Sequence, residues 1–397
     1  CGLEPHIRFS TKVTGIKYIG TGHWQISTQD MAKGTGNNDY FATHVVSANG
    51  PLSTPRMPEV AGMHQFKGES FHTAQWDYDV DLKGKNVGII GTGAIGGFYG
   101  AMLANGGNDV HFLLRSEYDA VVEKGITINS LVNEQLHLHP VQAYKDAADM
   151  PPCDWLFIGA KSTAGNLGDI ITRAGKPDAK VVLLQNGLSN EDQLRPFLPD
   201  TMHLIGGLCY VCLFREGPGL VKHQANGMVD LGYHSGPATT VEAQQALLKE
   251  GAELLASGKI PTRLLPGVDE ARWQKLVWNA PFNGISVVLN SGTQALLKDP
   301  ASNKLIKEMM EEVISTARAK GVSMPDGLAD KLLMGTGAMP DYQPSMYHDW
   351  LHKRPMELDS LYGELLRQGR EAGCSLPKIE AMLDQLTFIQ NRYLSNQ

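Results

Sequence analysis

One glycine-rich turn constrains the fold of this chain more than any other feature. It spans residues 91–96, with the sequence Gly-Thr-Gly-Ala-Ile-Gly, between the apolar run 87–90 and the helix-like segment 98–103. GxGxxG between a strand and a helix is typical of dinucleotide binding, because the glycines allow a tight turn, close approach of a pyrophosphate and close helix–strand packing. The phosphates then lie at the positive helix N-terminus. The predicted cofactor-binding residues of this turn are Gly91, Thr92, Gly93, Ala94, Ile95 and Gly96.

The end of the next predicted strand indicates which nicotinamide cofactor the turn would bind. This strand spans residues 109–114, and Arg115 and Ser116 follow it. An NAD site places an acidic side chain here to bind the ribose hydroxyls, whereas a guanidinium suits the 2′-phosphate of NADPH. We therefore expect NADPH, with Arg115 as a binding residue. The alternative is that Arg115 is a solvated residue of an ordinary loop.

Composition excludes several classes of protein. A net charge of −7, with acids and bases interspersed, provides no basic surface for nucleic acid. No apolar run reaches the roughly 18 residues of a membrane span. The five cysteines are widely spread, and Cys209 and Cys212 lie in an apolar run, so we predict core packing and a cytoplasmic location. Because the first residue is Cys1 and not Met, we expect a fragment of a longer reading frame.

Three segments of the chain differ in their hydrophobic patterns. Residues 1–83 carry short alternating runs between glycine-rich turns, which predicts a small β-rich fragment. In residues 84–265 apolar strands alternate with helical segments, and a β-hairpin is expected at 217–234. Residues 266–397 show helical spacing only. We therefore predict an α/β fold: a Rossmann-type, doubly wound parallel sheet that binds NADPH, followed by an all-helical domain for substrate binding and dimerisation. A small substrate would bind in the cleft between them.

A polar stripe on the first predicted helix of the third segment is the main candidate for catalysis. Lys275, Asn279 and Asn283 follow at intervals of four residues on a helix otherwise made of Leu, Val, Trp and Phe. On such a helix the stripe would be buried or line a cleft, where a bound polar substrate would supply its partners. Pro281 is expected to bend this helix and free a carbonyl. The alternative is the solvated stripe of an amphipathic helix.

Residues 85–392 resemble the ketopantoate reductase (2-dehydropantoate 2-reductase) family. The matching features, in chain order, are the glycine turn, Lys161 after an apolar strand, the Gln-Asn-Gly-Leu turn at 185–188, the polar stripe, and the segments 344–349 and 354–357. The chain departs from the family pattern at Pro281 and Pro355. The resemblance implies NADPH-dependent reduction of a branched 2-keto acid, 2-dehydropantoate to pantoate, in pantothenate biosynthesis.

The resemblance also implies the catalytic residues. Lys275 would donate the proton to the carbonyl oxygen when NADPH delivers hydride to the ketone carbon. A free lysine has a pKa of about 10.4. Burial beside Trp278 and Phe282 would lower this pKa, and a nearby carboxylate would raise it. Glu357 would be that carboxylate, binding a substrate hydroxyl and orienting the lysine; without the motif it would be an ordinary solvated glutamate.

The remaining contacts follow from the same resemblance. Asn279 and Asn283 would hold the hydroxyl and carboxylate of the substrate, and Ser345 would add a hydroxyl contact. Asn186, on a turn at the carboxyl edge of the sheet, would touch both the nicotinamide ribose and the substrate. Lys161 would favour the negatively charged cofactor.

The first fifth of the chain resembles a different family. Residues 66–77 are similar to the FxGxxxHxxxW fingerprint of Baeyer–Villiger flavin monooxygenases, and residues 45–51 to their linker strand. Residues 1–83 contain no glycine loop for the flavin pyrophosphate, so we expect no flavin chemistry and no catalytic role for His72 or Trp76. Whether the junction reflects recombination or a gene-model error stays open.

Three alternatives to 2-dehydropantoate reduction also stay open. The same fold could reduce another 2-keto acid, the N-terminal resemblance could mark a remnant flavin-dependent ketone monooxygenase, or the chain could bind NADPH without catalysis. The histidines have no metal-ligand spacing, so no metal is expected. The expected partners are a small 2-keto acid and a second copy in a homodimer, with neither nucleic acid nor membrane.

Overall fold

The structure is a computed structural model, and it describes residues 7, 9–31, 37–46, 85–161 and 165–395. The chain forms two compact units, Cys1–Asp81 and Leu82–Gln397. The fingerprint at residues 66–77, with His72 and Trp76, lies outside the described residues.

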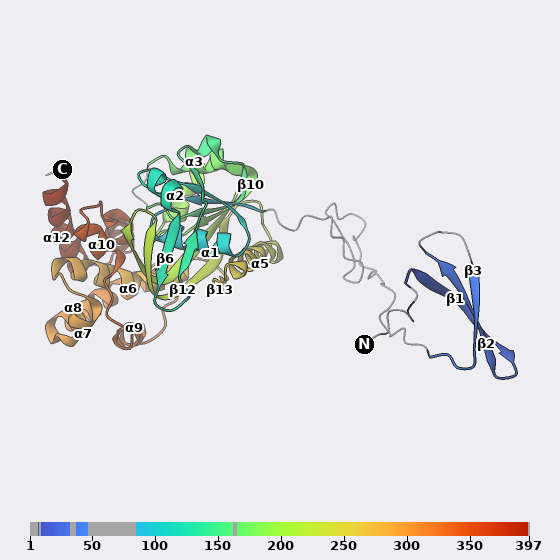
Figure 1. Ribbon diagram of the computed structural model, residues 1–397. Helices are drawn as coiled ribbons and strands as arrows, with labels where there is room; N and C mark the ends of the chain where they lie inside the picture. Colours follow the sequence, from blue (N-terminus) through green and yellow to red (C-terminus); the bar gives the residue numbers. More distant parts are fainter. Residues whose placement is uncertain (1–6, 8, 32–36, 47–84, 162–164, 396–397) are drawn as a thin grey trace. The chain divides into compact units, whose positions relative to one another are not determined.

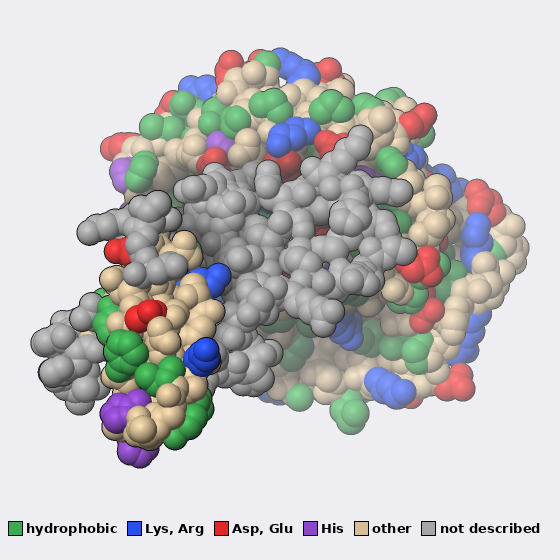
Figure 2. All heavy atoms as spheres, turned by 90° about the vertical axis from the view of Figure 1, so that its right-hand side faces the viewer, with side chains coloured by type: hydrophobic (Ala, Val, Ile, Leu, Met, Phe, Trp, Pro, Cys, Tyr) green, Lys and Arg blue, Asp and Glu red, His purple; other side chains and the backbone are tan. Residues whose placement is uncertain are grey.

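The first unit contains a three-stranded antiparallel sheet, which confirms the small β-rich fragment. Its strands pair in chain order and are β1 (Thr11–Gly20), β2 (His23–Asp30) and β3 (Asn37–Ala42). The β1–β2 turn has left-handed backbone at Gly20, Thr21 and Gly22 (φ 90°, 51° and 76°), a conformation that glycine adopts without a steric cost. Several apolar side chains of this sheet are exposed, and Figure 2 shows them in green at its surface.

The second unit is built on a ten-stranded sheet (Figure 1). Six strands run parallel in the order β8-β5-β4-β9-β10-β11, which confirms the predicted doubly wound topology. These strands are β4 (Asn86–Ile90), β5 (Asp109–Leu113), β8 (Gln142–Tyr144), β9 (Cys153–Ile158), β10 (Gly175–Leu183) and β11 (His203–Gly217). The winding direction reverses between β4 and β9, and such a reversal leaves a crevice at the carboxyl ends of the strands.

A long hairpin makes this sheet mixed rather than purely parallel. The hairpin predicted at 217–234 begins earlier, because β11 pairs antiparallel with β12 (Leu220–Ser235) along nearly its whole length. Strand β11 is both the sixth parallel strand and the first strand of the hairpin. Because it is one continuous apolar run, its sequence does not show where the hairpin begins. Strand β12 also pairs in parallel with β6 (Ile126–Ser130) and β13 (Thr262–Leu265), and β6 pairs with β7 (Leu136–Leu138).

Helices cover both faces of the sheet. Buried side chains of α1 (Ala94–Asn105) and α5 (Val241–Ser257) pack on one face. Those of α3 (Leu167–Ala174) and α4 (Asn190–Leu194) pack on the other. The short helix α2 (Tyr118–Lys124) follows β5. Because both faces are covered, the central parallel strands β4 and β9 are buried along nearly their whole length.

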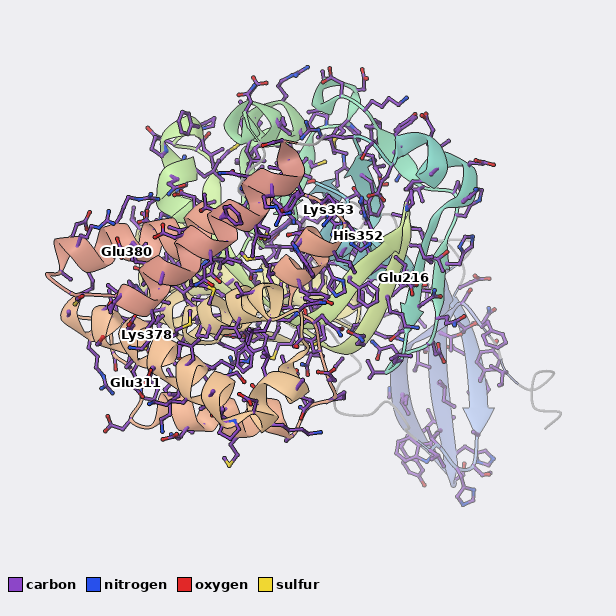
Figure 3. All side chains as sticks on the ribbon, turned by 90° about the vertical axis from the view of Figure 1, so that its left-hand side faces the viewer. Glu216, Glu311, His352, Lys353, Lys378 and Glu380 are labelled. Carbon is purple, nitrogen blue, oxygen red and sulfur yellow. The ribbon has the colours of Figure 1, made fainter. Side chains whose placement is uncertain are left out.

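The C-terminal part of the second unit is helical, as predicted (Figure 3). Its helices are α6 (Asp269–Val288), α7 (Thr293–Lys298), α8 (Pro300–Ala319), α9 (Leu328–Gly337), α10 (Ser345–Leu351), α11 (Glu364–Glu371) and α12 (Pro377–Leu394). They share one apolar cluster, in which α8 and α12 pack on α6. A π-helical turn, Asp359–Gly363, runs directly into α11.

Helix α6 runs through Pro281 without ending. Pro281 has no N–H to donate to the carbonyl of Val277. The carbonyl of Ala280, next to the proline, accepts a hydrogen bond from the Tyr362 hydroxyl at 2.7 Å. Of the helices in the described residues, none is long and apolar enough to cross a membrane.

Candidate functional site

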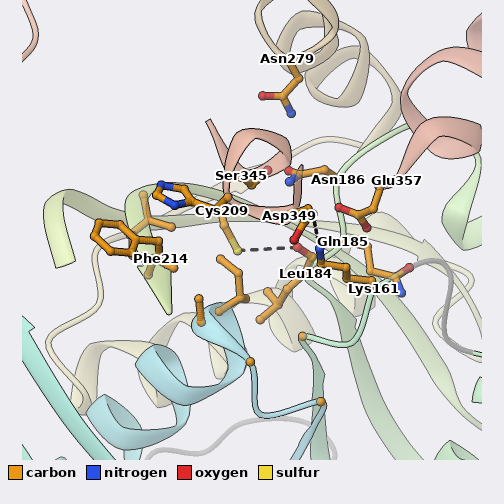
Figure 4. Close-up of a pocket in the computed structure, with 18 of the residues that line it drawn as sticks. Lys161, Leu184, Gln185, Asn186, Cys209, Phe214, Asn279, Ser345, Asp349 and Glu357 are labelled. Atoms are coloured by element: carbon orange, nitrogen blue, oxygen red, sulfur yellow. Dashed lines mark hydrogen bonds and ion pairs between the residues drawn. The ribbon is translucent and has the colours of Figure 1, made fainter. Parts of the chain in front are cut away.

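A cavity of about 870 Å³ lies in the second unit, at the carboxyl ends of the sheet strands and beside helices α6, α9 and α10 (Figure 4). Apart from Gly96, every candidate residue from the sequence lines it. The lining candidates are Gly91, Thr92, Gly93, Ala94, Ile95, Arg115, Lys161, Asn186, Lys275, Asn279, Asn283, Ser345 and Glu357. Two distant parts of the sequence, the glycine turn and the polar stripe, therefore share one cavity.

The glycine turn has the geometry that a pyrophosphate requires. Gly91 has φ of +85°, and a Cβ there would collide with the backbone of Ala160. A Cβ on Gly96 would collide with the Gly91 carbonyl, which explains why Gly96 packs beneath the cavity rather than lining it. Around Gly93, in contrast, no described residue other than its two chain neighbours has a heavy atom within 4 Å of where a Cβ would be. Helix α1 begins at the next residue, so the open space lies at its positive N-terminus.

Arg115 and Glu117, which follow β5, differ in their surroundings. Arg115 is exposed, and no carboxylate of the described residues pairs with it. The nearest acid in the sequence, Glu117, is buried, pairs with Arg215 and accepts a hydrogen bond from the Gly219 amide at 2.8 Å. The carboxylate that could have bound ribose hydroxyls is thus occupied, and the guanidinium remains accessible.

Lys275 projects from α6 into the cavity. Its ammonium donates a hydrogen bond to Oδ1 of Asn186 at 2.8 Å and lies 5.5 Å from the centre of the Tyr210 ring. The pKa of Lys275 is lowered to about 8, chiefly by burial, while Cys209 and Glu357 oppose the shift and Arg272 adds to it. A lysine with this pKa can release its proton near neutral pH.

A buried ion pair that the sequence analysis did not identify holds the wall behind Lys275. Arg272, one helical turn before Lys275, pairs with Glu191, and each side chain is only 4% exposed. The Arg272 guanidinium also donates to the carbonyl of Gln185, the residue before Asn186. Gln185 in turn donates to the carbonyl of Ala160 at 2.7 Å. These contacts connect α6 to the turn that carries Asn186. In the sequence, the position of Arg272 on a largely apolar helix is the feature that could have indicated a buried ion pair.

The asparagines of the stripe have different surroundings. Asn283 is held by protein: its amide donates to the carbonyl of Asn279 at 3.0 Å, and its Oδ1 accepts from the amide of Met346 at 3.0 Å. The Ser345 hydroxyl lies 3.4 Å from the same oxygen. No described residue hydrogen-bonds the side chain of Asn279, which extends from α6 (top of Figure 4) above Asn186 and Glu357. Asn279 is therefore available to a ligand, whereas Asn283 joins α10 to α6.

Another ion pair, besides that of Arg272 and Glu191, lies at the cavity and joins the end of β9 to α10. Lys161, after β9, pairs with Asp349 of α10, and Asp349 also accepts from Nε of Arg354 at 3.1 Å. Glu357 is 8% exposed and lies on the same side of the cavity (Figure 4). Cys209 and Cys212 are buried, unlinked and line the cavity. Within the described residues no group of His, Cys, Asp and Glu could hold a metal ion.

Comparisons with known proteins agree with this geometry. The family described as ketopantoate reductase PanE/ApbA matches residues 87–236, and its C-terminal domain matches residues 268–390. A 2-dehydropantoate 2-reductase from Nostoc sp. is 36% identical over 314 residues, which cover 79% of this chain and 98% of that protein. The crystal structure of 2-dehydropantoate 2-reductase from Geobacter metallireducens superposes with a TM-score of 0.70 at 31% identity, covering 76% and 99% of the two chains.

A more distant structure shares the fold alone. It is the ternary structure of D-mandelate dehydrogenase with NADH and anilino(oxo)acetate, which has a TM-score of 0.68 at 20% identity and covers 78% of this chain and 99% of its own.

The N-terminal segment matches different proteins. The flavin-binding monooxygenase-like family matches residues 1–124. A Baeyer–Villiger monooxygenase from Streptomyces coelicolor is 44% identical over 94 residues, which are 23% of this chain and only 17% of that enzyme. Both sequence resemblances are thereby confirmed. Because the two reductase domains together span most of the chain and contain the whole cavity, the chain belongs to the ketopantoate reductase family.

Proposed function

We propose that this protein reduces 2-dehydropantoate to pantoate with NADPH, and that Lys275 is the proton donor. The observation that carries the proposal is the Lys275 ammonium, which meets Asn186 at 2.8 Å in a cavity that also contains the glycine turn. A keto acid bound there would have its carbonyl between a hydride donor and a proton donor. Relatives that share most of this chain are named 2-dehydropantoate 2-reductases, which supports the substrate.

Two features of the cavity support NADPH as the cofactor: the glycine turn and Arg115. The turn and the N-terminus of α1 would receive the pyrophosphate, and the unpaired Arg115 would receive a 2′-phosphate. Glu117 is the described acid after β5 that lines the cavity, and Arg215 already pairs with it, which leaves the ribose hydroxyls without this carboxylate. When bound, the cofactor would supply hydride to the ketone carbon. Lys161, already paired with Asp349, would border the cofactor from the end of the neighbouring strand β9.

Residues of the chain would donate the proton and orient the substrate. Negative charge forms on the carbonyl oxygen as hydride arrives, and Lys275 would transfer its proton to that oxygen and become neutral. Asn186 would fix the ammonium through the existing hydrogen bond. Asn279 would bind the substrate with an amide that has no partner among the described residues, Glu357 would bind the substrate hydroxyl, and Ser345 would add a contact.

Steady-state oxidation of NADPH with 2-dehydropantoate tests the proposal. We expect turnover with kcat/KM at least tenfold higher for NADPH than for NADH, since each well-placed charged contact to the 2′-phosphate contributes about 1.5 kcal/mol or more. The variant Arg115→Ala should remove most of this preference. Binding of NADPH without turnover of any 2-keto acid would contradict the proposal and support a non-catalytic nucleotide-binding protein.

A second candidate substrate is a 2-keto acid with a bulkier apolar side chain. Beyond Lys275 the cavity continues along an apolar wall between β11 and α9, formed by Tyr210, Trp278, Leu332, Met339 and Tyr342. The Trp278 ring lies 6.5 Å from the Tyr342 ring and donates from Nε1 to Thr336 at 2.9 Å, so this wall is fixed. A panel that includes phenylglyoxylate and 2-ketoisovalerate beside 2-dehydropantoate would decide between the substrates.

Other expectations follow the same proposal. We propose residues 1–83, 84–265 and 266–397 as the domains, with the third providing the substrate side and the contacts of a homodimer. A cytoplasmic location agrees with the unlinked cysteines at 153, 209, 212 and 374.

A further inference from the structure

We propose that Asn226 is an additional cofactor-binding residue, and that His223 holds it in position. The inference rests on the proposed use of a nicotinamide dinucleotide. In this proposal, a residue of β12 contacts the pyrophosphate of that dinucleotide, in the same cavity as the glycine turn.

The backbone of β12 is irregular where it passes the cavity. In the pairing with β11, Leu213 is opposite His223 and Cys212 is opposite Ala225, so one residue between them bulges out. A second bulge follows at Gly227, since Val211 is opposite Asn226 and Tyr210 is opposite Met228. Bulges redirect side chains and are frequent next to active sites. Here they bring Asn226 to the lining of the cavity, beside Val211.

Asn226 has a left-handed backbone conformation, with φ of 62°. Such a conformation costs about 1 kcal/mol or more for a residue with a side chain, and it persists only where the surroundings enforce it. The side chain is exposed at the cavity, and no described residue hydrogen-bonds its carboxamide. The fold thus maintains an unfavourable backbone geometry around an amide that has no partner among the described residues.

His223 provides the enforcing contact. Its side chain is completely buried, and its Nε2 lies 2.9 Å from the carbonyl oxygen of Asn226. A carbonyl only accepts, so Nε2 carries the proton and donates it to that hydrogen bond. Nδ1 then accepts from the Ser130 hydroxyl at 2.9 Å. Burial lowers the pKa of His223, which keeps the ring neutral and in this single tautomer.

The same histidine places the bulge beside the N-terminus of α1. Its ring packs on Phe98, with 4.5 Å between the ring centres. Phe98 lies four residues after Ala94, the first residue of α1, and therefore one turn above the expected phosphate position. Asn226 and the residues Gly93–Ile95 line the same cavity. An amide N–H from Asn226 would thus be available to donate to a phosphate oxygen bound at the helix N-terminus.

Two variants of Asn226 test this contact by the dissociation constant of NADPH, measured by fluorescence titration of the full chain. Asn226→Gly removes the amide while tolerating positive φ, and we expect the dissociation constant to rise about tenfold, the loss of one hydrogen bond to a charged group. Asn226→Asp keeps the size but introduces negative charge, and we expect a larger rise that shrinks as salt is added. Lys259→Gly, at a left-handed position that does not line the cavity, is the matched control and should bind normally.

The variant His223→Phe tests the positioning role. It should raise the NADPH dissociation constant as Asn226→Gly does, and the double variant should bind no more weakly than either single variant. If His223→Phe does not fold, the two Asn226 variants decide alone. Wild-type affinity in both Asn226 variants, or a change only in the KM of the keto acid, would overturn the inference. Failure of the unaltered chain to bind NADPH would instead contradict the proposed function.

Discussion

The two units of this chain differ in what surrounds their apolar side chains. In the N-terminal sheet Val13 is 51% exposed and Phe41 is 64% exposed, and among the described residues of that unit only Thr28 is buried. In the second unit Phe282 is fully buried, as are Ile306 and Ile89. A three-stranded sheet without a packed face has little independent stability, whereas the second unit has a core on each face of its sheet and a third among its helices.

The difference in burial explains why the candidate site lies in the second unit. A catalytic group needs a dry, fixed environment to acquire an unusual pKa and a defined partner. The second unit provides this for Lys275, and the described part of the first unit has no comparable interior. Matched substitutions in the two units therefore test the comparison directly.

The largest expected effect is on catalysis. Lys275→Ala should lower kcat by about 10²- to 10⁴-fold, the usual contribution of a general acid, with the NADPH dissociation constant unchanged. The matched substitution in the first unit, Lys17→Ala on β1, removes an exposed lysine and should leave kcat unaltered. Equal rates for both variants would show that the two lysines are equivalent, and the comparison would fail.

The next largest effect is on stability. Arg272→Met leaves Glu191 buried without its partner, and we expect the free energy of unfolding to fall by about 3–5 kcal/mol in a urea titration. Arg370→Met breaks an exposed ion pair with Glu380 and should cost no more than about 1 kcal/mol. A similar loss in both variants would mean that burial does not set the strength of these pairs.

A smaller effect compares the apolar side chains of the two units. Ile306→Val removes one methyl group from the helical core and should lower the free energy of unfolding by about 0.5–1.5 kcal/mol. Ile16→Val makes the same change on β1, where the side chain is 47% exposed, and should have almost no effect on the unfolding of either unit. Comparable losses at both positions would indicate that the sheet buries Ile16 in solution.

The smallest effect is expected from removing the first unit. A chain that starts at Leu82 retains every described residue that lines the cavity. We expect its kcat/KM with NADPH and 2-dehydropantoate to match that of the full chain within about twofold. A loss of tenfold or more would show that residues 1–81 contribute to the reductase.

The features that could be predicted from the sequence are those that depend on residues close together in the chain. The glycine turn is defined by steric limits within six residues, and the stripe of Lys275, Asn279 and Asn283 by the period of one helix. The helical and strand segments followed from the same periodicities, and the fold class was predicted correctly.

The features that were missed depend on residues far apart in the sequence. Arg272 and Glu191 are separated by 81 positions, and Ser130 and His223 by 93. No local pattern indicates that such residues meet. The sequence alone also indicates no protein partner for any of the three polar residues of the stripe, so a bound substrate is expected to supply their hydrogen bonds. In the structure the Oδ1 of Asn283 already accepts a hydrogen bond from the backbone amide of Met346, on another helix.

The pH dependence of kcat/KM shows whether the part-buried ammonium of Lys275 donates the proton to the keto acid during reduction. Burial lowers the pKa of Lys275 to about 8, and the donor must be protonated for reduction. Reduction of 2-dehydropantoate should therefore be constant below this pH and fall about tenfold per pH unit above it. Oxidation of pantoate should show the opposite dependence, since the neutral amine must then accept the proton. A profile without a break near this pH in either direction, or the same break in Lys275→Ala, would contradict the account.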